Sequence, residues 1–233
     1  MFIIPDTHIK KYKSVITSLV NPIEGIYTLK FKPLNCSYRY RPGQFLHLAL
    51  DKDYDGSGQW PESRCFSMQS NPDDETIKIT YAVKGRFTKL MEQQLKFGTE
   101  VWLKLPYGDL FTQPHKKENT VFIAGGTGIT PLLSLFTHKS FNEYVNPHIY
   151  LGFRSEEYNI YREELNQSCN PFKLVKYFYE NDNGFIDVSG IYNERGTNSD
   201  YFISGPPVMI LEFKHFLIAN GVPVSRILTD DWE

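Results

Sequence analysis

The first half of the chain alternates between apolar and polar residues in short runs separated by turn residues. Alternation with a period of two is typical of β-strands that bury one face. Such runs occupy residues 14–19, 26–31, 44–50, 76–83 and 100–105. One segment, 87–95, instead places Leu90, Met91 and Leu95 on one face of a helix. These patterns predict a small antiparallel β-barrel of about five or six strands, interrupted by one helix.

A different rhythm begins after the polar stretch at 112–119. Runs typical of buried strands lie at 120–124, 148–152, 173–179, 201–204 and 225–228, and helical segments lie near 131–136, 161–167 and 207–220. Strands that alternate with helices indicate βαβ units and a parallel sheet. We therefore expect two domains, an N-terminal antiparallel β-barrel over residues 1–113 and a C-terminal α/β domain with a parallel sheet over 114–233.

A glycine turn joins the first predicted strand of the second domain to a helix. Gly125, Gly126 and Gly128 allow the backbone to turn tightly and to approach a ligand, and Pro131 suits a first helical turn. The amides at such a helix start face a diphosphate, with the positive end of the helix dipole behind them. Pro131 replaces the third glycine of the usual dinucleotide fingerprint. The alternative is a strand–turn–helix corner that binds nothing.

A second stiff turn, Gly205-Pro206-Pro207, follows the predicted strand at 201–204. In open α/β sheets, ligands bind at the carboxyl ends of the strands, which is where this turn lies. Taken by itself, Pro-Pro is also an ordinary helix start.

The barrel carries a third group of candidates. Arg64 offers a planar fork that suits a phosphate, Phe66 can lay its ring on a flat ligand, and Ser67 can donate a hydrogen bond. Gly85 to Thr88 opens the predicted helix, so its amides and the Thr88 hydroxyl can form a second anion site. Each residue singly also fits a structural role, as a surface arginine, a core phenylalanine or a helix-capping threonine.

Seven short segments of this kind occur in one order along the chain. They are Pro42-Gly43-Gln44-Phe45, Arg64-x-Phe66-Ser67, Gly85-x-Phe87-Thr88, Pro106-Tyr107-Gly108, Gly126-x-Gly128-x-x-Pro131, Gly152-Phe153-Arg154 and Ser204-Gly205-Pro206-Pro207. The series closely resembles the ferredoxin–NADP reductase family over roughly residues 10–233. The resemblance implies that the barrel is an FAD-binding domain and that the α/β domain binds NAD(P).

The resemblance also implies roles for individual residues. Arg64 pairs with the flavin diphosphate, Phe66 lies against the isoalloxazine, and Ser67 bonds near N5, where hydride arrives. Ser67 is therefore the candidate closest to the chemistry. The ribityl and phosphate groups are held by Val83, Gly85, Phe87 and Thr88. The nicotinamide nucleotide is held by Gly126, Thr127, Gly128 and Thr130, and its nicotinamide side is walled by Gly205, Pro206 and Met209.

Several positions depart from the family pattern or leave a choice open. Phe66 replaces the usual tyrosine, as in members that reduce free flavins, and the lost hydrogen bond is worth ~1 kcal/mol. Ser204 replaces a cysteine before Gly205. Trp232 covers the flavin if it acts as the C-terminal aromatic of some relatives does, or else it is frayed or packed in a core.

The identity of the hydride donor stays open between NADH and NADPH. Arg154 follows a predicted strand and can take an adenosine 2′-phosphate, which favours NADPH. Glu156 and Glu157 lie beside it and oppose an added phosphate.

Composition and charge exclude several other classes of partner. The 233 residues carry 25 Lys+Arg against 27 Asp+Glu, a formal net charge of −2, which argues against nucleic acid as the main partner. No apolar stretch approaches the ~20 residues of a membrane span. Cys36, Cys65 and Cys169 show neither a disulfide pattern nor metal-ligand spacing, and we find no signal peptide, so we expect a reduced, cytoplasmic protein.

One rival motif lies in the barrel half. Asp51-x-Asp53-x-Asp55-Gly56-x5-Glu62 matches the spacing of an EF-hand calcium loop. However, a strand-like run precedes it, and Pro61 stands where a helix should begin. The alternative is an acidic, glycine-rich connection between two barrel strands, and we expect no metal site.

The resemblance to the ferredoxin–NADP reductase family implies a flavoprotein oxidoreductase that takes hydride from NAD(P)H onto bound FAD. Electrons then pass to an acceptor such as ferredoxin, flavodoxin or an oxygenase component. The alternative enzyme is an NAD(P)H:flavin reductase that uses free flavin as substrate. A subunit that turns over only inside an electron-transfer complex, and a calcium-binding module at residues 51–62, are the other hypotheses.

Overall fold

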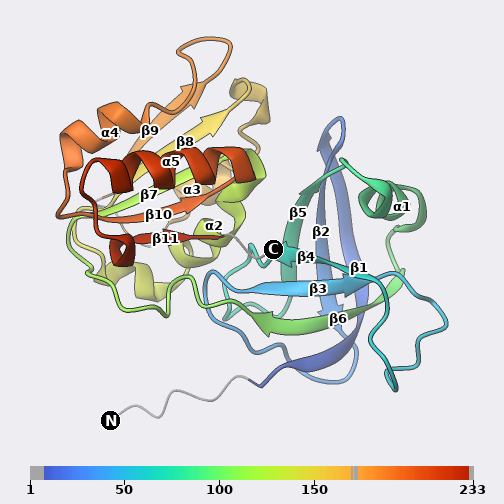
Figure 1. Ribbon diagram of the computed structural model, residues 1–233. Coiled ribbons are helices and arrows are strands. Elements are labelled where there is room, and N and C mark those ends of the chain that lie inside the picture. The colour runs from blue at the N-terminus through green and yellow to red at the C-terminus, as the bar shows by residue number, and fades with distance from the viewer. Residues whose placement is uncertain (1–7, 169, 171–172, 231–233) are drawn as a thin grey trace. The chain divides into compact units, whose positions relative to one another are not determined.

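The computed structural model describes residues 8–168, 170 and 173–230, and Figure 1 shows their arrangement. The chain divides into two compact units, Met1–Asp109 and Leu110–Glu233. We describe each unit by itself. The expected division, between residues 113 and 114, lies four residues further along the chain than this one (113 − 109 = 4).

The first unit is a six-stranded antiparallel sheet with the order β4-β3-β6-β1-β2-β5. Its strands are β1 (Lys10–Ile23), β2 (Ile26–Pro33), β3 (Phe45–Ala49), β4 (Ser63–Ser67), β5 (Ile77–Ala82) and β6 (Glu100–Tyr107). One helix, α1 (Arg86–Gln94), follows β5. The barrel-like antiparallel fold expected from the alternating pattern is therefore confirmed. Strand β4 was not among the periodic runs, because its apolar stretch is too short to show a period.

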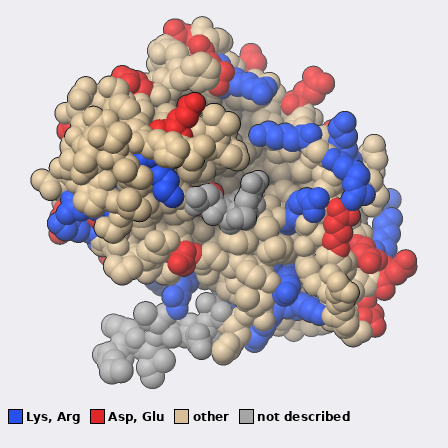
Figure 2. All heavy atoms as spheres, viewed as in Figure 1, with Lys and Arg blue, Asp and Glu red and all other residues tan. Residues whose placement is uncertain are grey.

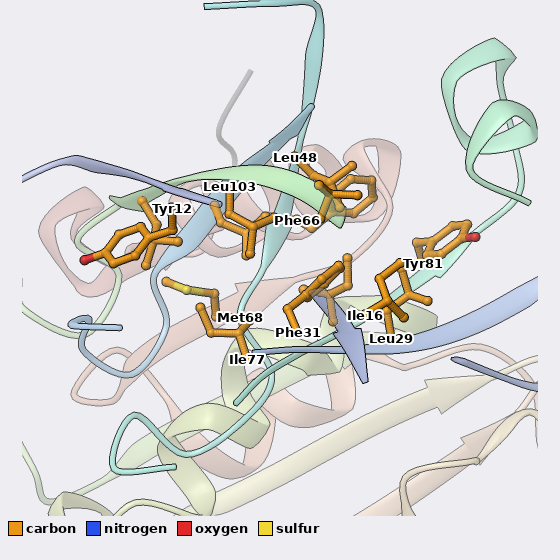
Figure 3. Close-up of a cluster of buried hydrophobic side chains, with 14 of the residues drawn as sticks. Tyr12, Ile16, Leu29, Phe31, Leu48, Phe66, Met68, Ile77, Tyr81 and Leu103 are labelled. Atoms are coloured by element: carbon orange, nitrogen blue, oxygen red, sulfur yellow. The ribbon is translucent and has the colours of Figure 1, made fainter. Parts of the chain in front are cut away.

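Alternate residues of these strands fill the interior of the first unit (Figure 3). Ile16, Leu29 and Phe31 are fully buried, as are Leu48 and Leu103. Removing a large apolar side chain from water stabilises the fold by roughly 1.5–3 kcal/mol. Helix α1 adds Phe87 and Met91 to the same core, so the position of its N-terminus is fixed by packing.

The second unit is a five-stranded parallel sheet with the order β11-β10-β7-β8-β9. Its strands are β7 (Thr120–Gly125), β8 (His148–Phe153), β9 (Leu174–Tyr179), β10 (Asp200–Ser204) and β11 (Ile227–Thr229). Its helices are α2 (Thr130–Phe136), α3 (Arg162–Asn166), α4 (Val188–Arg195) and α5 (Pro207–Ala219). Short 3-10 turns are η1 (Gly126–Ile129), η2 (Lys139–Glu143), η3 (Glu156–Tyr158) and η4 (Val224–Arg226). The α/β prediction is confirmed.

Both faces of the parallel sheet are covered by apolar packing. Phe122 and Phe202 belong to the core on one side, and Val121 and Tyr201 belong to the core on the other. This two-sided burial explains why β7 and β10 appear as continuous apolar runs in the sequence. Among the residues that the structure describes, no helix is long and apolar enough to cross a membrane.

The strand order reverses beside β7, because β8 and β9 follow on one side of it while β10 and β11 lie on the other. Connections leave the sheet in opposite directions at such a point, and ligands bind in the resulting crevice outside the carboxyl ends of the strands. The carboxyl ends of β7 and β10 carry the two glycine turns that the sequence singled out.

Candidate functional site

The two glycine turns of the second unit are packed backbone to backbone. A Cβ atom added to Gly128 would lie 2.4 Å from the Gly205 Cα atom and 2.5 Å from the Gly205 nitrogen. Real Cβ atoms do not approach backbone this closely, so any side chain at position 128 would clash with the second turn. Glycine at position 128 is therefore required by packing within the unit.

Met209 fills the space beside these turns. A Cβ atom on Gly125 would lie 2.9 Å from the Met209 sulfur, and one on Gly205 would lie 2.6 Å from the Met209 Cε atom. Gly205 also has a φ of +153°, which disfavours any other residue. Met209 and Pro206 thus pack against the end of β7, and their predicted contact with a nicotinamide stays a prediction.

Gly126 differs from the other glycines of the turn. It has a φ of +54°, and no described atom lies within 4 Å of an added Cβ atom. We expected Gly125, Gly126 and Gly128 all to allow a ligand to approach. Gly125 and Gly128 instead face protein atoms, and Gly126 is the position where the described backbone meets open space.

The threonines of this turn differ in their exposure. Thr130 is 4% exposed, and its hydroxyl donates to the Thr127 carbonyl oxygen at 3.0 Å. Thr127 is partly exposed. Thr130 therefore closes the turn onto helix α2, where Pro131 occupies the first helical turn as predicted.

Ser204, at the end of β10, turns toward the last described residue of the chain. Its hydroxyl donates to an Asp230 carboxylate oxygen at 3.2 Å, and the residue is 1% exposed. Trp232 lies outside the described residues, so its predicted contact with a flavin stays a prediction.

Arg154 lies at the carboxyl end of β8 with its guanidinium 5.7 Å from the Tyr158 ring centroid. We expected Glu156 to oppose a phosphate at this position. Glu156 instead pairs with Arg162, with 2.5 Å between Nη2 and Oε1, and this pairing raises the pKa of Arg162. The Glu156 carboxylate is thus paired with the Arg162 guanidinium.

In the first unit, Arg64 is exposed on strand β4 and held above helix α1. Its Nη1 donates to the Ser63 carbonyl oxygen at 2.8 Å, and its Cζ atom lies 5.3 Å from the Phe87 ring centroid. Phe87 is 5% exposed, so its ring forms a fixed platform beneath the guanidinium. The structure therefore brings Arg64 to the start of α1, and its pairing with a phosphate stays a prediction.

The start of α1 is closed by Thr88. Its hydroxyl oxygen accepts from the Lys84 and Gly85 amides at 3.0 and 3.1 Å, and it donates to the Gly85 carbonyl oxygen at 3.1 Å. Gly85 is the N-cap residue. Val83 packs against the barrel core, and its amide donates to Gly25 at 2.8 Å. Thr88 is thus a capping residue, while the remaining first-turn amides lack intrahelical acceptors.

Glu62 and Arg86 complete this region, and the sequence did not single out Arg86. Both carboxylate oxygens of Glu62 lie 2.6 Å from Arg86 Nη2, and Oε1 lies 3.4 Å from Arg64 Nη2. The hydrogen bond from Arg86 is the main cause of a lowered Glu62 pKa. Figure 2 shows acidic and basic side chains close together on the barrel unit. No spacing rule relates positions 62 and 86, so this contact had no signal in the sequence.

Phe66 and Ser67 lie at the end of β4. Phe66 is 9% exposed and packs in the barrel core, with its ring centroid 6.0 Å from that of Tyr81 (Figure 3). Ser67 is 8% exposed and pairs with Phe45 across the sheet. The Phe66 ring therefore has the core position that we considered as its structural alternative, and its contact with a flavin stays a prediction.

Two of the seven segments, 42–45 and 106–108, contact each other within the first unit. Gln44 donates to the Gly108 carbonyl oxygen at 2.9 Å, and the rings of Phe45 and Tyr107 stack with centroids 5.6 Å apart. A Cβ atom on Gly108 would lie 3.0 Å from the Phe45 ring. These segments hold β3 and β6 together.

The side chains of the acidic loop at 51–62 that the structure describes contact protein groups. The Lys11 ammonium donates to the Gly56 and Gly58 carbonyl oxygens at 3.1 and 3.4 Å. Asp55 accepts from Ser57, and Glu62 faces Arg86. Within the described part of the chain, no group of three His, Cys, Asp or Glu residues could hold a metal ion. The geometry does not support calcium binding.

Comparison with known proteins adds independent findings. The family described as "Oxidoreductase NAD-binding domain" matches residues 122–214. The chain is 27% identical over 242 residues to the reductase component of propane 2-monooxygenase from Rhodococcus jostii (strain RHA1), covering 95% of this chain and 64% of that protein. It is similarly 27% identical to the gamma subunit of sulfhydrogenase 2 from Pyrococcus furiosus, covering 88% of this chain and 76% of that protein.

Solved structures share the fold. A ferredoxin NADP+ reductase from Neisseria gonorrhoeae with bound FAD and NADP superposes with a TM-score of 0.73 at 16% identity, covering 97% of this chain and 99% of that one. A flavohemoglobin from Malassezia yamatoensis superposes with a TM-score of 0.78 at 21% identity, covering 95% of this chain and 60% of that one.

Proposed function

We propose that this chain, a member of the ferredoxin–NADP reductase-like family, is an FAD-dependent oxidoreductase that takes hydride from NAD(P)H and passes electrons to an acceptor. The observation that carries this proposal is that each unit presents a helix start suited to phosphate. In the first unit α1 begins beside Arg64, and in the second α2 follows the open backbone at Gly126.

The first unit fits the phosphates of FAD. Two guanidiniums already hold a carboxylate beside the start of α1, and carboxylate and phosphate oxygens accept the same hydrogen bonds. Arg64 and the first-turn amides of α1 would hold the diphosphate, while Phe87 and Thr88 fix the guanidinium and the helix start. Bound FAD accepts hydride and releases electrons onward, so the protein supplies binding, orientation and exclusion of water.

Ser67 is our candidate for the residue near the flavin N5, where its hydroxyl would donate a hydrogen bond. Its position at the end of β4, three residues after Arg64, supports this assignment. No side-chain base is required, since hydride transfer moves no proton to the protein.

The second unit fits a nicotinamide nucleotide. Gly126 offers backbone that a diphosphate can approach, and the start of α2 lies at the switch point of the sheet. Thr127 and the backbone of Gly128 and Thr130 complete the turn, and Gly205, Pro206 and Met209 form its wall. Arg154 is our candidate for the adenosine end of the nucleotide.

The acceptor is proposed from the relatives. One of them is the reductase component of a monooxygenase, and the chain spans 64% of its length. We propose a redox acceptor of that kind, a ferredoxin, a flavodoxin or an oxygenase component. We also propose a cytoplasmic location, which the free thiols of Cys36 and Cys65 support.

A second candidate function is the reduction of free flavin. The burial of Phe66 favours it, because a ring engaged in the barrel core offers less contact to a flavin. A weakly held flavin would then act as a substrate.

The test is the visible spectrum of the purified protein, followed by anaerobic addition of NADH or NADPH. Yellow protein with a band near ~450 nm that one nucleotide bleaches would support the leading proposal and identify the donor. Colourless protein that oxidises NAD(P)H when free flavin is supplied would support the second candidate. Protein that is inert with flavin present would contradict both.

A further inference from the structure

Three charged side chains meet beside the start of α1, and we call them the Glu62 cluster: Glu62, Arg64 and Arg86. Arg64 comes from β4, Glu62 directly precedes that strand, and Arg86 is the first residue of α1. The Glu62 carboxylate lies between the two guanidiniums, 2.6 Å from Arg86 and 3.4 Å from Arg64. The cluster therefore joins two elements separated by the whole of β5.

The two arginines are held differently. The Ser63 carbonyl oxygen and the Phe87 ring fix Arg64, which leaves its Nη2 directed toward Glu62. The Arg86 side chain is 72% exposed and forms an ion pair with Glu62. The negatively charged Glu62 carboxylate thus pairs with N–H groups of both arginines, as a bound phosphate would.

We propose that Glu62 is an internal competitor for the phosphate-binding guanidiniums, so that its carboxylate must release Arg64 and Arg86 when the diphosphate of FAD binds. This inference rests on the proposed function. Arg86 would then be a second phosphate-binding arginine, in addition to Arg64. The cluster carries two positive charges and one negative charge, and loss of the carboxylate would leave both positive charges for the ligand.

If Glu62 positions the arginines instead of competing for them, the expected change in FAD affinity has the opposite sign. If Glu62 positioned the two arginines and stayed in place beside the ligand, its removal would let the guanidiniums scatter and would weaken FAD binding. The sign of the change in affinity therefore separates competition from positioning.

The experiment is a titration of flavin-free protein with FAD, followed by the quenching of flavin fluorescence. We expect E62Q to lower the Kd for FAD about three- to tenfold at low salt, since an anion competitor is removed. Riboflavin, which has no phosphate, should bind both proteins equally. E92Q is the matched control, because Glu92 lies on the same helix but accepts from the Tyr27 hydroxyl, away from the cluster.

R86Q provides an independent variant, for which we expect weaker FAD binding and unchanged riboflavin binding. Equal or weaker FAD binding by E62Q would overturn the inference while leaving the proposed function intact. An equal gain in affinity with E92Q would also overturn it, since net charge would then explain the effect. If the wild-type protein bound neither FAD nor riboflavin, the proposed function would fail, and the inference with it.

Discussion

The close packing of the two glycine turns leads to a prediction for Gly128→Ala. The added methyl group would lie 2.4 Å from the Gly205 Cα atom and 2.7 Å from the Ser204 carbonyl carbon. Ordinary van der Waals contact needs about 3.4–4 Å, so the backbone must shift by roughly 1 Å or more. Because the clashing atoms are backbone, no side-chain rotation can relieve the overlap.

The expected magnitude follows from overpacking. Extra methyl groups in a packed interior cost typically 1–3 kcal/mol, and a backbone clash belongs at the upper end, about 2–3 kcal/mol. For a unit of this size, unfolding entropy converts each 1 kcal/mol into roughly 4 °C. We therefore expect the second unit to unfold about 8–12 °C below the wild type.

Gly126→Ala is the matched comparison. No described atom lies within 4 Å of its added methyl group, so only the strain of a φ of +54° remains, about 1 kcal/mol. Its thermal shift should be roughly 4 °C. If Gly126 faces the nucleotide, this variant should nevertheless lose most of its affinity for NAD(P)+.

The assay is calorimetric unfolding of both variants together with nucleotide titration. A Gly128→Ala protein that melts with the wild type would refute the packing argument. A Gly126→Ala protein that keeps its full nucleotide affinity would refute the assignment of that glycine to the ligand.

Three further predictions concern local groups. Burial is the main cause that lowers the pKa values of three histidines, and a neighbouring cation adds to it: Lys104 beside His47, Lys117 beside His115 and Arg195 beside His148. The unfolded chain binds protons at these histidines more readily than the folded protein does, so the free energy of unfolding should decrease as the pH drops below about 6.5. A urea midpoint that increases when the pH is lowered from about 7.5 to about 5.5 would contradict this prediction. Thr88→Val should cost about 1 kcal/mol in urea unfolding and weaken FAD binding through the lost cap, whereas Thr88→Ser should restore both. Arg154→Gln should weaken NADP+ more than NAD+ in parallel titrations, and equal effects on the two nucleotides would remove Arg154 from the 2′-phosphate assignment.

Elements with a strong local pattern, either a period or a continuous apolar run, could be predicted from the sequence. The continuous apolar runs of β7 and β10 and the amphipathic face of α1 have strong local signals. Helix α4 was missed because it is short and contains Gly190, although Val188, Ile191 and Tyr192 pack toward the core. Strand β4 was also missing from the predicted runs, since five residues are too few to establish alternation.

The hydrogen-bond partners of the candidate site residues could not be predicted from the sequence. The Thr88 and Thr130 hydroxyls satisfy their own helix starts, which depends on the local path of the backbone. The pairing of Glu62 with Arg86 depends on how the loop before β4 meets α1, and Glu156 finds Arg162 for a similar reason. The ion pairs of long charged side chains depend on the tertiary structure, so sequence spacing does not predict them.

The seven segments that resemble the family contain two kinds of residue, those required by packing within the fold and those open to a ligand. Gln44 with Gly108, and Gly128 with Gly205, are joints that this fold needs whether or not a ligand binds. Resemblance at such positions is therefore evidence of the fold and says little about binding. Evidence of binding has to come from groups that the fold leaves open, and Gly126 is such a group because its backbone conformation disfavours other residues and the space around an added Cβ atom is open. Substitutions at open positions, compared with substitutions at the joints, are thus the changes that can distinguish a working flavoprotein from a chain that only shares its architecture.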